Sequence, residues 1–142
     1  MTQTLRLVSY NLLEGLRPIA SPVGERRHFD RARVEAARAV VDGLRPDVLV
    51  LNEALFCQEH RGRVVDYSRL FGFPYLSSAL YDNAWGNAIL SRWPILRPHQ
   101  MRTEDRGGLV AVIGVMMSDL TVAAYHPTRT ATQPIKRQIS CA

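Results

Sequence analysis

The most constraining feature of the chain is a buried-strand pattern that ends in a carboxylate, the sequence Pro-Asp-Val-Leu-Val-Leu-Asn-Glu-Ala that starts at Pro46. Its consecutive apolar residues, Val48 to Leu51, indicate a strand that is covered on both faces. Glu53 follows at the end of this strand, where open α/β sheets bind their ligands and where a carboxylate can reach a metal ion or a substrate. A glutamate in this position can also simply end the strand in solvent.

Length and composition indicate one globular domain over residues 1–142, because 142 residues with 46% hydrophobic content can bury a sizeable core. No run approaches the roughly 18 apolar residues of a membrane span, and Met1 to Val8 lacks the apolar segment of a secretory signal. Cys57 and Cys141 form no Cys-x-x-Cys pair, which argues against a disulfide framework and a thiolate zinc site. We therefore expect a cytoplasmic protein.

The formal net charge of +5 comes almost wholly from arginine, since Lys136 is the only lysine. The planar guanidinium group suits bidentate recognition of phosphate. An arginine-rich composition can equally reflect genomic base bias, so the charge alone favours an anionic ligand only weakly.

The first half of the chain predicts a β-α-β unit. Leu5 to Tyr10 is compatible with a strand that ends at Asn11, and Leu16 to His28 has the prolines, glycine and charges of a functional loop. Asp30 is placed to cap a helix, which Pro46 ends. The apolar residues of this helix recur at spacings of three and four, namely Val34, Ala37, Val40, Val41 and Leu44.

The second half predicts a short helix and then mostly strands. The helix spans Arg63 to Phe71, with Gly72 as its C-terminal signal. Ser118-Asp119 has the composition of a tight hairpin turn. The sequence thus favours an α/β fold of the α+β type, a mixed sheet with helices on one face. The predicted strands are Tyr75 to Leu80, Ala88 to Ser91, Ile95 to Met101, Leu109 to Met116 and Leu120 to Tyr125.

Four separated segments of the chain form an ordered set of motifs. They are Ser9-Tyr10-Asn11-Leu12, Leu51-Asn52-Glu53-Ala54, Gly86-Asn87-Ala88-Ile89-Leu90-Ser91-Arg92 with Pro94-Ile95, and Ala123-Ala124-Tyr125-His126-Pro127. In this order they resemble motifs of the endonuclease/exonuclease/phosphatase superfamily, and the resemblance extends over nearly the whole chain. Asn52 stands where that family more often has glutamine, and Tyr125 where it often has threonine.

The resemblance implies part of a four-layer αββα sandwich and a phosphoesterase that uses Mg²⁺ or Mn²⁺. It implies that Glu53 holds the metal, that Asn11 supports it with a neutral oxygen, and that His126 is catalytic and contacts the scissile phosphate. The substrate would carry a phosphate, whether a nucleic acid, a phospholipid or a sugar or inositol phosphate. Asparagine is also a common turn residue, and a histidine can end a strand by satisfying a backbone group.

Other candidates carry weaker signals. Asn87 and Arg92 flank a strand in which Gly86 permits close backbone approach, and they could bind substrate or serve as a turn asparagine and a solvated arginine. Arg106, before two glycines, could bind a substrate phosphate. Cys57 and His60 have a spacing that zinc sites use, but they lack a second ligand pair.

The chain has neither the Gly-Asp-x-Asn nor the Ser-Asp-His motif of the family, and we expect it to correspond to the N-terminal portion of a truncated member. Weak or no activity is therefore expected of the chain alone. The alternatives are a non-catalytic module that binds a phosphate ligand or a partner, and a fragment without independent function. We also expect an apolar sheet face without its partner sheet, which would promote self-association or docking of a C-terminal half. Its residues would be Ile89, Val110, Val112, Ile113, Val122 and Ala124.

Overall fold

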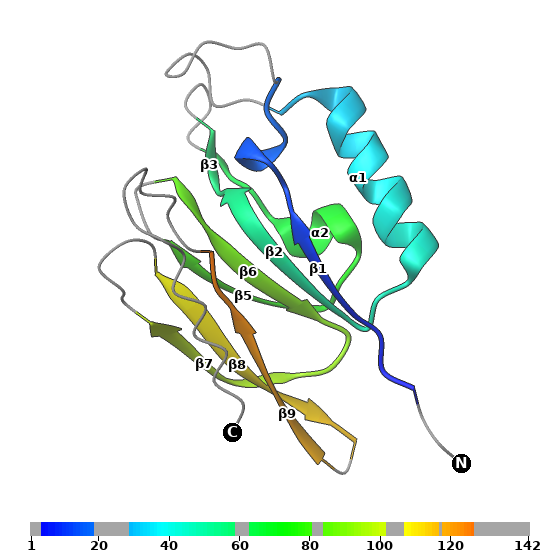
Figure 1. The fold of residues 1–142 in the computed structure, drawn as a ribbon, viewed down its shortest axis with the longest axis vertical. Helices are drawn as coiled ribbons and strands as arrows, with labels where there is room; N and C mark the ends of the chain where they lie inside the picture. The colour runs from blue at the N-terminus through cyan, green and yellow to red at the C-terminus, as the bar shows by residue number, and fades with distance from the viewer. Residues whose placement is uncertain are drawn as a thin grey trace, which may run out of the picture.

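The computed structural model describes residues 4–18, 29–58, 63–80, 84–101, 107–116 and 118–126. In this part of the chain two larger β-sheets pack face to face, and two helices lie on the outer face of the first sheet (Figure 1). The elements are β1 (Leu7–Asn11), the 3-10 turn η1 (Glu14–Leu16), α1 (Arg31–Leu44), β2 (Val48–Leu55), β3 (Cys57–Gln58), β4 (Arg63–Val64), α2 (Tyr67–Phe71), β5 (Tyr75–Leu80), β6 (Trp85–Ser91), β7 (Ile95–Met101), β8 (Gly108–Val115) and β9 (Ser118–Ala124).

The predicted β-α-β unit is present, with β1 and β2 parallel and adjacent. Asp30 caps α1, since its side chain accepts a hydrogen bond from the backbone N–H of Arg33. The helix ends at Leu44, where Arg45 adopts a left-handed conformation and Pro46 follows. Because β1 and β2 run in the same direction, their C-terminal ends meet at one edge of the sheet.

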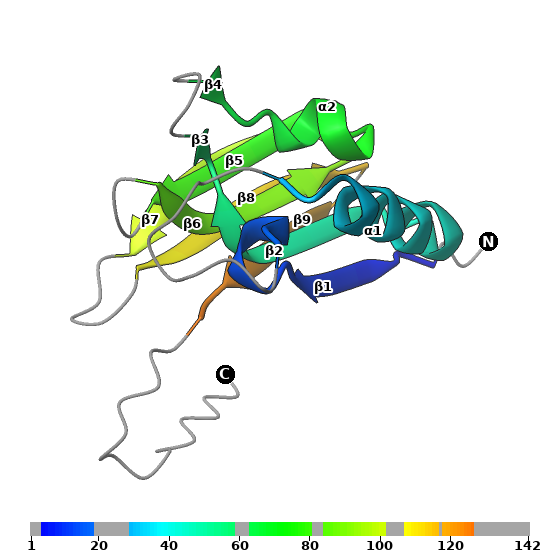
Figure 2. The ribbon, with the colours of Figure 1, turned by 90° about the horizontal axis from the view of Figure 1, so that it is seen from above.

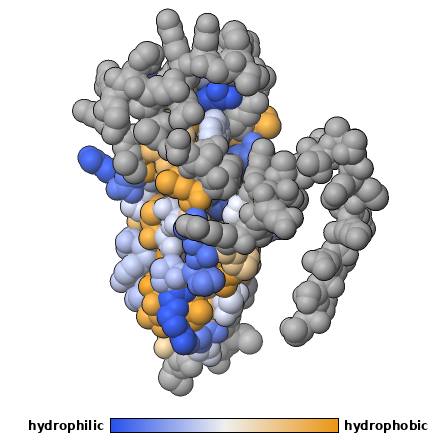
Figure 3. All heavy atoms as spheres, turned by 90° about the vertical axis from the view of Figure 1, so that its left-hand side faces the viewer, coloured by the Kyte–Doolittle hydropathy of each residue, from blue (hydrophilic) through white to orange (hydrophobic). Residues whose placement is uncertain are grey.

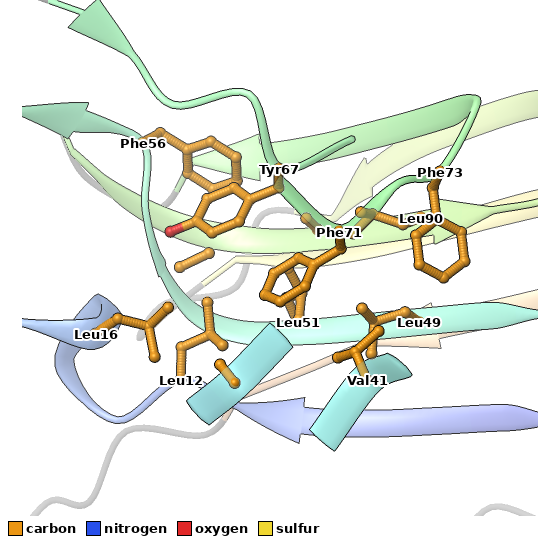
Figure 4. Close-up of a cluster of buried hydrophobic side chains, with 13 residues drawn as sticks. Leu12, Leu16, Val41, Leu49, Leu51, Phe56, Tyr67, Phe71, Phe73 and Leu90 are labelled. Atoms are coloured by element: carbon orange, nitrogen blue, oxygen red, sulfur yellow. The ribbon is translucent and has the colours of Figure 1, made fainter. Parts of the chain in front are cut away.

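The first sheet has the strand order β1-β2-β6-β5, and Figure 2 shows these strands side by side. Its outer face packs on α1 and α2 to form the helix-side core (Figure 4). Tyr67 of α2 is fully buried there and donates a hydrogen bond from its hydroxyl to the carbonyl of Leu55 at 2.9 Å. The buried residues of the helix-side core are Leu12, Leu16, Ala37, Val41, Leu49, Leu51, Ala54, Phe56, Tyr67, Phe71, Phe73, Ala88 and Leu90.

The second sheet has the order β7-β8-β9 and covers the inner face of the first, which corrects the expectation of an unpartnered apolar face. The chain supplies both sheets. Ile89 and Ile113 are fully buried between them, whereas Val110 and Val112 face outward by the alternation of β8 and are half-buried. The buried residues of this inter-sheet core are Val48, Val50, Ala79, Ile89, Leu109, Ala111, Ile113, Val122 and Ala124.

Two further predictions need correction. The second helix begins at Tyr67 rather than Arg63, because Asp66 caps it and Arg63–Val64 instead pairs with β3 as β4. The β8–β9 turn precedes Ser118, which pairs with Val115, so Ser118 and Asp119 belong to β9.

On the side of the molecule that Figure 3 shows, hydrophobic and hydrophilic residues are intermingled. Large apolar side chains exposed on the edge strands β5 and β7 include Tyr75, Leu80 and Leu96. Neither of the described α-helices combines the length and apolar character needed to cross a bilayer.

Candidate active site

A β-bulge in β2 places two consecutive polar side chains on the same face of the sheet. β2 pairs with β6 in regular register up to Leu51 and resumes at Ala54, so Asn52 and Glu53 together oppose one residue, Asn87. Leu51 and Ala54 both belong to the helix-side core, so Asn52 and Glu53 both point toward the second sheet. Without the extra residue, strict alternation would turn Glu53 toward the helices with Leu51.

The backbone of Glu53 is strained by this arrangement. Its φ is 54°, in the left-handed region, which costs a residue with a Cβ roughly 1–2 kcal/mol. Such strain persists where the surrounding structure enforces it, and it clusters at functional sites. The bulge therefore lowers local stability and directs the Glu53 carboxylate toward the second sheet.

Two side chains from distant parts of the sequence, Asn11 and His126, meet at Glu53. β1, β2 and β9 run toward the same end of the molecule (Figure 1). Asn11 is the last residue of β1, Glu53 lies near the end of β2, and His126 follows β9. Glu53 Oε1 is 2.9 Å from His126 Nε2 and 3.4 Å from Asn11 Nδ2. The side chains of His126 and Glu53 are 20% and 19% exposed, so the cluster is sheltered but reachable from solvent.

Hydrogen bonding fixes the orientation of the Asn11 amide. The backbone N–H of Leu13 donates to Asn11 Oδ1 at 2.8 Å, so the amide nitrogen must face Glu53 and His126. His126 Nε2 approaches Glu53 Oε1 so closely that it must carry a hydrogen there. Its lone pair is then unavailable to Asn11 Nδ2, 3.3 Å away, so both donors point at the Glu53 carboxylate.

Arg33 of α1 holds the loop that follows β1, a role that the sequence analysis missed. Its guanidinium group donates to the carbonyls of Leu12 at 3.1 Å and Leu13 at 2.9 Å, and also to that of Arg17. Leu13 is the residue whose N–H fixes the Asn11 amide. An arginine in the first turn of an amphipathic helix resembles a solvated residue in sequence, so no local signal distinguished it.

The same loop packs directly on the bulged half of β2. The N–H of Leu12 donates to the carbonyl of Asn52 at 3.0 Å. Gly15 has a φ of +64°, and a Cβ there would lie 2.4 Å from the Cβ of Leu55. Only glycine fits this approach, so the loop and the bulge form one tightly packed unit.

The structure separates the remaining candidates from one another. Asn87 lies opposite the bulge, completely buried, and donates from Nδ2 to the carbonyl of Gly107 at 3.0 Å. Arg92 lies at the opposite end of β2 from Glu53, where its Nε donates to the carbonyl of Pro46 at 3.2 Å and its guanidinium covers the Phe73 ring. Arg106 and His60 lie outside the described residues, as does the side chain of Cys57.

The donor set at Glu53 suits a hard cation. In the described part of the chain no group of three or more histidine, cysteine, aspartate or glutamate side chains could hold a metal ion. The available oxygens are the Glu53 carboxylate and neutral amide oxygens, of which Asn52 Oδ1 and Asn87 Oδ1 are buried and have no hydrogen-bond partner within the described ranges. Oxygen ligands with few protein charges fit Mg²⁺ or Mn²⁺ that keeps several waters. Glu53 would hold the ion. Asn11 was expected to support it with its oxygen, but Asn11 Oδ1 accepts from the N–H of Leu13 here, so Asn11 would instead orient the carboxylate through Nδ2.

Solved structures with a similar fold include two endonuclease/exonuclease/phosphatase proteins and TDP2. One from Beutenbergia cavernae DSM 12333 gives a TM-score of 0.65 at 20% identity, and one from Leptotrichia buccalis C-1013-b gives 0.64 at 11%. Truncated Caenorhabditis elegans TDP2 gives 0.56 at 14%. These comparisons cover 84%, 88% and 70% of this chain, but only 37%, 55% and 40% of the matched chains. No family model and no curated protein matches the sequence.

The comparisons confirm the fold that the sequence motifs predicted. At such low identities the similarity concerns the fold, and a fold alone does not determine a function. The chain spans between about a third and just over half of the length of the compared structures. The chemistry of this chain therefore has to be argued from its own site.

Proposed function

We propose that this chain, which has the fold of endonuclease/exonuclease/phosphatase proteins, carries the metal-binding part of a phosphoesterase site that uses Mg²⁺ or Mn²⁺. The observation that supports the proposal is the convergence of Asn11, Glu53 and His126 at one end of the inter-sheet space, with Oε1 of Glu53 as the common acceptor. The β-bulge that aims Glu53 there at a cost in backbone strain supports it further.

Each of the three side chains has a distinct role in this proposal. Glu53 supplies the anionic oxygen for the cation, which when bound would neutralise charge on a phosphate and help position the reacting groups. Asn11 donates to Glu53 and so keeps the carboxylate in one orientation. His126 Nε2 donates to Glu53 Oε1 in this structure; if the carboxylate turned to a bound cation, that N–H would become available to a phosphate oxygen, or could give its proton to the leaving alcohol when water replaces it on phosphorus.

The substrate class stays open among nucleic acids, phospholipids and sugar or inositol phosphates. The basic net charge of +5 supports an anionic substrate. We do not assign substrate contacts to Asn87 or Arg92, because one is buried and the other lies at the far end of β2. Arg106 stays a prediction, as do the cytoplasmic location and the single domain over residues 1–142.

Metal binding is the direct test of the proposal. We expect the purified chain to bind Mn²⁺, measured by electron paramagnetic resonance, and Glu53→Gln to remove that binding. Arg31→Gln is the matched control, since its guanidinium is exposed on α1 and pairs only with Glu35 among the interactions described for it. Undiminished binding by Glu53→Gln would place the metal elsewhere and contradict the proposal.

Turnover separates an enzyme from a binding module. With bis-para-nitrophenyl phosphate and para-nitrophenyl phosphate we expect weak metal-dependent hydrolysis at most, reduced about 100-fold by His126→Ala. Robust turnover that Glu53→Gln abolishes would show that this chain is a competent enzyme and that the expectation of weak activity is wrong. Binding of inorganic phosphate without metal or turnover, unchanged in Glu53→Gln, would favour the non-catalytic module.

A further inference from the structure

Two buried amide oxygens beside the bulge, Oδ1 of Asn52 and Oδ1 of Asn87, have no hydrogen-bond donor in the described part of the chain. Asn87 is completely buried, and its amide nitrogen donates to the carbonyl of Gly107 at 3.0 Å. That contact requires a donor, so it also fixes which end of the Asn87 amide is the oxygen. Buried carbonyl oxygens nearly always have a donor, so the pair marks a place where one is missing.

The strand register places these two side chains together and next to Glu53. Asn52 and Glu53 both oppose Asn87 at the bulge in the β2–β6 pair, so the three residues are neighbours across the two strands. Asn87 lies two residues before Ile89 of the inter-sheet core, so its side chain is on the same inner face as Asn52 and Glu53. His126 approaches that face from the second sheet.

The missing partner must supply hydrogen-bond donors in a place that also holds a carboxylate. A hydrated divalent cation meets both conditions, because its charge suits Glu53 and its retained water offers polarised O–H donors. A single buried water would satisfy the oxygens too, but its binding would not depend on Glu53. The two occupants therefore predict different responses to the same substitutions.

We propose that Asn52 Oδ1 and Asn87 Oδ1 accept hydrogen bonds from the water of hydration of a Mg²⁺ or Mn²⁺ ion held at Glu53. The inference rests on the proposed function and gives the two asparagines a positioning role at its metal site. It explains why two acceptors are buried without donors at the one place where the β2–β6 pairing is interrupted. It also replaces the expected contact of Asn87 with substrate by a contact with the hydrated ion.

The test compares Mn²⁺ affinity with the thermal stability of the metal-free protein. In Asn52→Leu the new side chain has a volume similar to that of asparagine but lacks the amide oxygen. We expect its dissociation constant for Mn²⁺ to rise about tenfold, as with other groups that support a metal site from outside its ligand shell. Its metal-free melting temperature should be at least that of the wild type, because an unsatisfied buried acceptor is removed. A merely structural role would instead lower the melting temperature.

Asn52→Asp keeps an acceptor oxygen and should bind Mn²⁺ at least as tightly as the wild type.

Ser77→Ala is the matched control, because Ser77 pairs with Ile89 and lies on the same inner face away from the bulge. It should leave Mn²⁺ affinity unchanged. Undiminished affinity in both Asn52→Leu and Asn87→Leu, with binding lost in Glu53→Gln, would overturn this inference and leave the metal site standing. A wild-type chain that binds no Mn²⁺ would overturn the inference and the proposed function together. If Asn52→Leu does not fold, Asn52→Ala carries the same prediction for Mn²⁺ affinity.

Discussion

At the start of β2 the polar groups are closely paired. The N–H of Arg6 donates to the carboxylate of Asp47 at 2.8 Å, the N–H of Arg92 donates to the carbonyl of Asp47 at 3.0 Å, and Arg92 Nε donates to Pro46. At the other end of the same strand, Glu53 has a left-handed backbone, and the buried Oδ1 of Asn52 has no donor among the residues that the structure describes. One strand thus has an end at which these polar groups are paired, and an end with a left-handed residue inside the strand and an acceptor without a described donor.

The difference supports the proposal that the Glu53 end of β2 is the functional end. Proteins satisfy local preferences in most of the fold and depart from them mainly at functional sites. The Arg92 end of β2 has hydrogen bonds and a cation–π contact that need no ligand to explain them. The Glu53 end has a left-handed residue, a histidine–carboxylate contact and two buried amide oxygens with no donor among the described residues; the water of a bound cation would supply such donors.

The largest effect on stability should come from the regular half of the strand. Leu51 is fully buried in the helix-side core, so Leu51→Ala should lower the free energy of unfolding by about 3 kcal/mol. Urea unfolding measures this loss. Mn²⁺ affinity, measured well below the melting temperature, should stay near that of the wild type. A large loss of affinity in a folded Leu51→Ala protein would show that the two halves of β2 are not separable.

A smaller effect should follow from Arg33→Lys. Lysine cannot span the three carbonyls of Leu12, Leu13 and Arg17, and hydrogen bonds from a charged donor suggest a loss of about 2 kcal/mol in unfolding free energy. The Asn11 amide would lose its fixed orientation, so Mn²⁺ affinity should fall as well. Arg31→Lys, whose side chain is 92% exposed, is the control and should change neither quantity measurably. Equal effects of Arg33→Lys and Arg31→Lys would show that Arg33 does not help to position Asn11 at the site.

Glu53→Gly should stabilise the protein, unlike the two substitutions above, while it removes the metal-binding carboxylate. Glycine adopts a φ of 54° without the penalty of a Cβ, so the free energy of unfolding should rise by about 1 kcal/mol while Mn²⁺ binding disappears. Ser9→Gly, in regular β1, is the control and should be destabilising by about 0.5–1 kcal/mol. A clearly less stable Glu53→Gly protein would show that the Glu53–His126 contact stabilises the fold by more than the left-handed φ costs. The bulge would then not reduce the net stability of the protein.

The sequence predicted the parts of the fold that follow from periodicity and caps. α1 begins after Asp30 and ends before Pro46, and β5 and β7 have the bounds that were expected. The burial of Val48 to Leu51 on both faces also followed from four apolar residues in succession. These features depend on neighbours in sequence, so local patterns were sufficient.

The predictions failed where contacts between distant segments decide the outcome. Strict alternation along β2 could not show that a bulge turns Glu53 to the inner face, because the extra residue is defined only by pairing with β6. The contacts of Arg33 with the loop after β1 depend on tertiary packing. We expected the first sheet to lack a partner sheet, but β7, β8 and β9 of the same chain form one. Periodicity predicts that a segment is a strand, whereas only strand pairing determines which sheet it joins.

The smallest effect on the free energy of unfolding should come from Asp66, which caps α2 on the helix-covered face of the first sheet, away from Glu53. Its carboxylate accepts hydrogen bonds from the Ser68 hydroxyl and the N–H groups of Ser68 and Arg69, which lower the pKa of Asp66 below its usual value of 3.8, the Ser68 hydroxyl contributing most. Asp66→Ala should reduce the free energy of unfolding by about 0.5 kcal/mol near neutral pH.

The pH dependence of that loss gives the sharper test of the Asp66 cap. Because the folded pKa is depressed, the contribution of the charge is complete above pH 3.8 and disappears as the pH falls through the lowered folded pKa. The difference in unfolding free energy between wild type and Asp66→Ala, measured by urea unfolding, should therefore stay constant above about pH 5 and shrink toward acid. Mn²⁺ affinity should not change at neutral pH, since Asp66 is separate from Glu53. A pH-independent difference would mean that the cap acts through its shape rather than its charge.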